Sequence, residues 1–161
     1  MLITAFTAYS DIREALGVED DELADETLSA KLYEDALMAD LDDVSLDLVT
    51  TFQTVNALAT PTEAQERFLR YARLFSTYSV ARQLLSSLPM FSMKSVEDGK
   101  ARMERFAEAY RDTIKTVNGE YDKYKNRLSQ ALASVSITGT ATVSRSYMSV
   151  VTPVSDPITG T

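Results

Sequence analysis

The sequence predicts a mainly α-helical protein: a bundle of about four helices, one of them long, followed by an extended or β-hairpin C-terminal tail. Three observations favour this fold class. Apolar residues recur every three or four positions before residue 134. Only 5 glycines and 4 prolines interrupt 161 residues. After residue 133 an alternating pattern of apolar and hydroxyl residues begins. We therefore expect a helical bundle domain over residues 1–133 and a docking tail over residues 134–161.

Local signals place the first two helices. Ser10 can cap a helix over residues 11–16, and Gly17 stands where a left-handed C-cap would end it. An acidic connector follows, and Asp25 is a plausible N-cap for a second helix that runs to about Leu48. The apolar positions of this second helix are predicted to face the core: Leu28, Leu32, Ala36, Leu37, Leu41, Val44 and Leu48.

The third helix has the strongest local start signal. Thr60 reads as its N-cap, Pro61 occupies the first helical position, and Glu63 completes a capping box. A broad apolar face follows, which predicts burial between at least two neighbours, and Pro89 ends the helix.

The fourth helix is the longest element and covers residues 96–134, after a weaker capping box at Ser95 and Asp98. At ~1.5 Å per residue it spans roughly 55 Å. Because a compact bundle of this size needs less, we expect part of this helix to project or to pack beside a second copy.

Composition argues against catalysis. The chain has no histidine, so it lacks the usual general base near neutral pH, and it has no cysteine. Carboxylate chemistry remains open for Glu104 and Glu108, but Lys100 and Arg111 flank them as in an ordinary ion-paired helix face. We expect no enzyme activity, cofactor or metal. No apolar run approaches the length of a membrane span, so no membrane contact is expected.

Charge is unevenly divided along the chain. Residues 1–60 hold 14 acidic and 2 basic residues, whereas residues 61–133 hold 9 acidic and 13 basic residues. This division indicates charge-complementary protein contacts. The predicted acidic surface, between subunits or along a channel, consists of Asp40, Asp42, Asp43 and Asp47. The spacing of these aspartates lacks the pattern of a calcium loop, which disfavours a metal site.

The basic residues of the third helix could bind phosphate, but the net charge of −8 disfavours nucleic acid. Pairing within the helix, or between subunits with the acidic segment, is preferred for Arg67, Arg70 and Arg73, and also for Arg82. The tyrosines could stack on bases, but their spacing within apolar stripes favours core or interface positions for Tyr71, Tyr78, Tyr110, Tyr121 and Tyr124.

The tail is too poor in large apolar residues to fold alone, and it carries little charge. It is therefore predicted to order on another protein, by strand addition or by threading a groove. The residues expected to dock are Val135, Ile137, Val143, Arg145, Tyr147, Met148, Val150 and Val151.

Short phrases of the sequence are similar to a known family. Residues 75–91 (FSTYSVARQLLSSLPMF), 94–100, 105–106 and 110–114, together with the opening at residues 9–17, resemble head-to-tail adaptor (connector) proteins of tailed bacteriophages. The resemblance covers roughly residues 5–133 and rests on organisation and short phrases, without a diagnostic catalytic motif.

The resemblance implies a structural protein of the virion. Such adaptors are helical bundles that form a ring of twelve copies below the portal, and they extend the DNA channel and provide a platform for tail or neck proteins. The expected partners are other copies of the chain, the portal protein and a tail or neck protein, while DNA passes without sequence-specific binding. The C-terminal extension would dock on the portal or on a neighbouring adaptor.

Two other functions stay open at this stage. The chain could be a cytoplasmic helical assembly chaperone or scaffold that leaves the final assembly. It could also be an all-helical enzyme that uses two carboxylates, for example on glycans.

Overall fold

A computed structural model describes residues 2–85 and 100–135, and the side chains of residues 2–85 and 111–135. Within these residues every regular element is a helix, which confirms the mainly α fold class. The predicted β-hairpin tail lies outside the described residues. The helices are α1 (Leu2–Phe6), α2 (Tyr9–Leu16), α3 (Asp25–Leu28), α4 (Lys31–Val44), α5 (Leu48–Asn56), α6 (Glu63–Leu84) and α8 (Lys100–Ser134).

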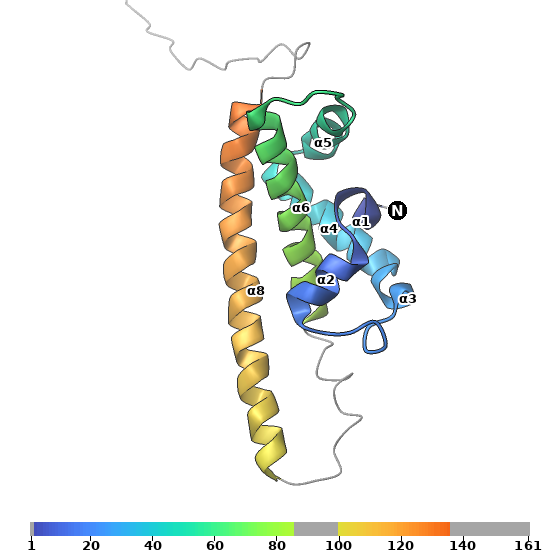
Figure 1. Cartoon of the computed structure of the whole chain (residues 1–161), viewed down its shortest axis with the longest axis vertical. Helices are drawn as coiled ribbons and strands as arrows, with labels where there is room; N and C mark the ends of the chain where they lie inside the picture. Colours follow the sequence, from blue (N-terminus) through green and yellow to red (C-terminus); the bar gives the residue numbers. More distant parts are fainter. Residues whose placement is uncertain (1, 86–99, 136–161) are drawn as a thin grey trace, which may run out of the picture.

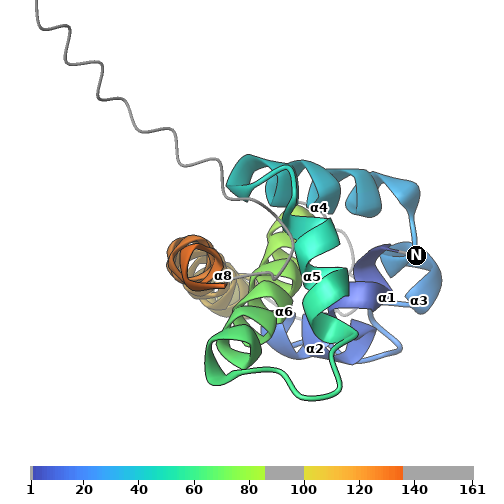
Figure 2. The same ribbon diagram turned by 90° about the horizontal axis from the view of Figure 1, so that it is seen from above.

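The helices form three layers with α6 in the middle (Figures 1 and 2). The long α8 runs antiparallel along one side of α6, and the short helices α1 to α5 cover the other side. Helix α6 contacts α1, α2, α4, α5 and α8, so it is the common partner of both outer layers. It follows that the two outer layers present their free faces on opposite sides of the molecule.

Two kinds of side chain allow α6 to pack against both outer layers. Large apolar side chains such as Phe68 and Phe75 are fully buried and fill the core. Small hydroxyl residues are also buried: Ser79 donates to the Asp40 carboxylate of α4 at 2.6 Å, and the hydroxyls of Thr77 and Thr7 share a hydrogen bond of 2.6 Å. These short polar side chains allow close approach of the short helices while their hydroxyls stay paired.

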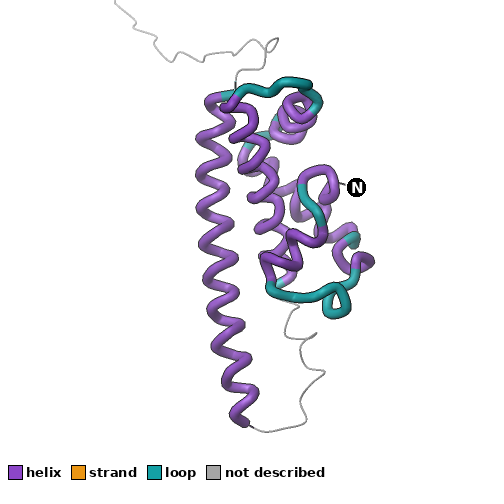
Figure 3. Tube along the Cα trace, in the orientation of Figure 1, coloured by secondary structure: helices purple, strands orange, loops and turns teal. Residues whose placement is uncertain are grey.

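Helix α8 is much longer than its partner. It has 35 residues and α6 has 22, which correspond to roughly 52 Å and 33 Å at 1.5 Å per residue. The first turns of α8 extend beyond the end of α6, as the tube in Figure 3 makes clear. The expectation that part of this helix projects is therefore confirmed.

The predicted helix starts were partly wrong. Gly17 is the left-handed C-cap of α2, with φ of 69°, as expected. However, α2 begins at Tyr9 after Ala8, so Ser10 lies inside the helix. The capping box of α6 is formed by Thr62 and Gln65, two residues after the predicted Thr60.

The predicted continuous helix from Asp25 to Leu48 was also wrong. Helix α3 ends after a single turn, and Ser29 and Ala30 turn the chain before α4 begins. The turn changes which residues face inward. Leu28, Leu37, Leu41 and Leu48 are buried as predicted, but the side chain of Leu32 is 72% exposed.

Candidate interaction surfaces

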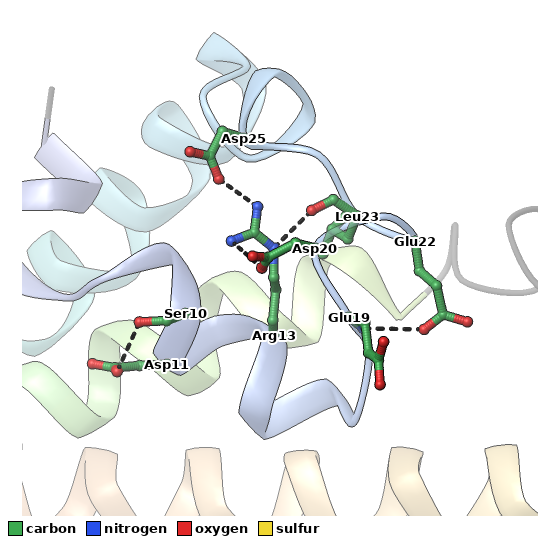
Figure 4. A network of polar contacts seen from close by, with 8 residues as sticks. All are labelled: Ser10, Asp11, Arg13, Glu19, Asp20, Glu22, Leu23 and Asp25. Carbon is green, nitrogen blue, oxygen red and sulfur yellow. Dashed lines mark hydrogen bonds and ion pairs between the residues drawn. The ribbon is translucent and has the colours of Figure 1, made fainter.

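One arginine organises the acidic loop between α2 and α3 (Figure 4). The Arg13 side chain is only 10% exposed. Its Nε donates to the Leu23 carbonyl oxygen at 2.7 Å, its Nη1 lies 3.0 Å from Asp20 Oδ1, and its Nη2 pairs with Asp25. This arginine therefore offsets part of the local negative charge and fixes the path of the loop. Sequence reasoning missed this role, because the pairing depends on how the loop returns to α2.

The four predicted aspartates do not form one surface. Asp40 is half-buried and accepts the Ser79 hydrogen bond, and Asp43 forms an ion pair with Lys125 of α8. Asp42 and Asp47 are exposed. The first pair therefore holds α4 to α6 and α8 within the chain, and the second pair remains available to a partner.

Asp40 of α4 also affects a side chain of α8. Burial, followed by the negative charge of Asp40, raises the pKa of the Tyr121 hydroxyl on α8. The hydrogen bond that the Lys125 ammonium donates to Asp43 raises the pKa of Lys125 in the same region. Both groups are thus held in their protonated forms beside the carboxylates of α4.

The predicted arginines lie along the exposed side of α6. Arg67 forms an ion pair of 2.9 Å with Glu63 one turn earlier, and Arg73 donates to Asn56 Oδ1 at 3.1 Å. Arg70 has no ion-pair partner among the described side chains. Arg82 lies apart from the other three, with its guanidinium 4.5 Å from the ring centre of Tyr121.

A shallow, open pocket of about 420 Å³ lies on this same side of α6. It combines two leucines with charged residues, and its lining consists of Glu66, Leu69, Arg70, Arg73 and Leu74. Apolar surface beside basic groups suits an apolar side chain that is flanked by carboxylates.

The tyrosines lie at the seam between α6 and α8. Tyr121 is buried, and Tyr71, Tyr78 and Tyr124 are half-buried and pack against the core. Tyr78 stacks on Tyr124 with ring centres 5.6 Å apart. This confirms their predicted packing role, whereas the side chain of Tyr110 lies outside the described residues.

Several large apolar side chains are exposed on the short helices. The most exposed are Leu46 at 81% and Leu32 at 72%. Leu46 lies between α4 and α5, next to Asp47. Single exposed apolar side chains are normal on protein surfaces, so these leucines become candidate contacts only through the groups beside them.

Most of the predicted docking tail lies outside the described residues. Val135 is half-buried against the core, and the other predicted tail residues, from Ile137 to Val151, lie outside the described residues. The side chains of Glu104 and Glu108 also lie outside them. Within the described part of the chain, no group of three or more metal-ligating side chains gathers, and no helix is long and apolar enough to cross a membrane.

The arrangement therefore offers contact surfaces in two layers and no constellation of catalytic groups among the side chains described. Comparison with known proteins leaves the relationship open, because no family model, no curated protein and no solved structure matches this chain.

Proposed function

We propose that this chain is a structural head-to-tail adaptor that assembles as a ring below a phage portal and extends the DNA channel. The proposal joins the sequence resemblance to one structural observation. That observation is the segregation of charge between the short helices α1 to α5 and the two long helices α6 and α8.

The short helices and the two long helices carry opposite net charge. The segment that holds α1 to α5 has 14 acidic and 2 basic residues, whereas α6 and α8 together have 7 acidic and 12 basic residues. Because the aspartates of the short helices and the arginines of α6 include exposed residues, the acidic segment of one copy can meet the basic helices of the next (Figure 2).

A contact between two different surfaces repeats from copy to copy. When the rotation between copies closes, such a heterologous contact produces a ring. A channel formed by this ring would favour an acidic or weakly charged lumen, because dense positive charge would hold the DNA phosphates. The exposed Asp42 and Asp47 supply negative charge for such a lumen or for the contact between subunits.

The projecting end of α8 gives the ring a second kind of contact. The first turns of α8, which extend beyond the end of α6, are the proposed contact for a protein stacked above or below the ring. In the proposed assembly this partner is the portal or a neck protein.

Mass photometry of the purified chain tests the proposal, alone and after mixing with the proteins encoded by its neighbouring genes. We expect particles of about a dozen copies, formed either alone or only on the portal, since such order often arises on docking. A chain that stays monomeric and binds none of these proteins would overturn the proposal.

Mass spectrometry of mature particles separates the adaptor from an assembly chaperone. An adaptor should be present in stoichiometric amount with the portal. A chaperone should be absent from the finished particle while binding its components beforehand.

A further inference from the structure

Two exposed features of this chain complement each other in polarity and charge. One is the pocket on α6 described above. The other is the segment of residues 42–47, which comprises the last residues of α4 and the connection to α5 and is here named the α4–α5 corner.

The α4–α5 corner presents an apolar tip between carboxylates. Leu46 is 81% exposed, and Asp42 and Asp47 are exposed on either side of it in the sequence. Asp43 differs from them because it pairs with Lys125 of α8. That ion pair links the corner to α8, so the tip is held in place.

The pocket on α6 has the converse composition. Leu74 and the small exposed part of Leu69 supply apolar surface, and Arg70 and Arg73 outweigh the single carboxylate of Glu66, so the lining has a net positive charge. Arg70 has no ion-pair partner within residues 2–85 and 111–135. A leucine flanked by two carboxylates matches this lining in both polarity and charge.

The two features lie on different sides of α6. Ser79 bonds to Asp40 and therefore faces α4, and Ala72, seven residues earlier, lies on the same side of the helix. Arg70 is two residues before Ala72, a rotation of about 200° around the helix axis. The pocket thus faces away from α4, and the corner of a chain is not placed to fill its own pocket.

We propose that the occupant of the α6 pocket is the α4–α5 corner of a second copy of this chain. Leu46 inserts between Leu69 and Leu74 of the neighbour, and the carboxylates of Asp42 and Asp47 face its Arg70 and Arg73. The inference rests on the proposed function and names the contact that links one subunit to the next. Because each copy keeps one free corner and one free pocket, the contact propagates around a ring.

Disulfide cross-linking provides a direct test, since the chain contains no cysteine of its own. Leu46→Cys and Glu66→Cys are introduced together, which changes two exposed positions and keeps both pocket arginines. Mild oxidation of the full chain at high micromolar concentration should give a ladder of cross-linked multimers on a non-reducing gel.

The controls use the same chemistry at other positions. Each single-cysteine variant should give dimers at most. Leu32→Cys combined with Glu66→Cys places the first thiol at an equally exposed leucine at the far end of α4, and it should give no ladder.

The outcomes separate the contact from the ring. Ring-sized particles without Leu46–Glu66 cross-links, or a ladder of equal strength from the Leu32 control, would overturn the contact and leave the proposed function standing. A ladder without ring-sized particles would support the contact and overturn the ring. The absence of any assembly would overturn both.

Charge reversal adds a quantitative test. Asp47→Lys or Arg70→Glu alone should raise the concentration of half-assembly about fivefold, as expected for loss of an exposed ion pair and introduction of like charges. The double variant should recover at least half of this loss on a logarithmic scale. Additive effects of the two single changes would contradict the proposed pairing.

Discussion

At the scale of single residues, buried polar groups fix segments that apolar packing leaves free. Arg13 is the clearest case, because one guanidinium bonds to the Leu23 carbonyl oxygen, to Asp20 of the loop and to Asp25 at the start of α3 (Figure 4). Leu23 is itself 1% exposed and joins the core. The arginine thus couples a highly acidic loop to the hydrophobic interior.

Replacing Arg13 with alanine should lower the free energy of unfolding by about 1–3 kcal/mol, because the Leu23 carbonyl loses its charged donor and the acidic loop loses its counter-charge. Urea unfolding followed by circular dichroism measures the change. Asp20→Asn is the matched control, since it removes only an 88% exposed partner and should cost less than about 1 kcal/mol. Equal losses for the two variants would show that the carbonyl bond contributes little.

At the scale of elements, helix starts and breaks were the least predictable features. Thr60-Pro61 and Thr62 are competing start signals, and the reciprocal bonds of Thr62 with Gln65 decide for the later one. Helix α5 was not predicted, because its threonines and valines are poor helix formers. Its buried face nevertheless has helical spacing through Leu48, Thr51, Phe52 and Val55.

The break between α3 and α4 has a related cause. Ser29 donates its hydroxyl to the Glu26 carbonyl oxygen at 3.0 Å, which ends α3 without glycine or proline. Because the turn rotates α4, Leu32 leaves the core while Leu37 and Leu41 enter it. Apolar periodicity therefore predicted which helices exist and most of their buried residues. The exposure of Leu32 depended on a turn that local sequence does not specify.

The competing caps of α6 can be separated by mutation. Thr62→Ala should destabilise the protein by about 1 kcal/mol, since it removes the hydroxyl that accepts a hydrogen bond from the backbone N–H of Gln65. Thr60→Ala should change stability by less than about 0.5 kcal/mol. Thermal or urea unfolding measures both variants. A larger loss of stability for Thr60→Ala than for Thr62→Ala would indicate that Thr60 is the cap.

At the scale of the whole molecule, ionisable groups from several helices share one pH dependence. Burial is the main cause that raises the pKa of Tyr9, Tyr78 and Tyr121, and nearby carboxylates add to it. Lys123 donates hydrogen bonds to Glu120 and Lys125 donates one to Asp43, and these bonds raise the pKa of both lysines. All five groups hold their protons more tightly in the folded chain than in the unfolded chain.

The folded protein should therefore lose stability in alkaline solution. A raised folded-state pKa contributes stability that is complete below the unfolded value, about 10 for tyrosine, and that disappears as pH rises through the folded value. Urea midpoints measured from pH 8 to pH 11.5 should fall above pH 10. The decrease of the urea midpoint with pH should be less steep for a variant that carries both Tyr78→Phe and Tyr121→Phe. An equally steep decrease would show that other groups cause the loss of stability.

The central position of α6 also determines how the protein folds. The short helices have little independent stability, since α1, α2, α3 and α5 have fewer than ten residues each. Their packing surface, like that of α8, is supplied by α6. Formation of α6 with one neighbour is therefore the step that creates a template for the rest. We therefore expect the short helices and α8 to become ordered together, so that a newly made chain presents both proposed assembly surfaces only once its domain is complete.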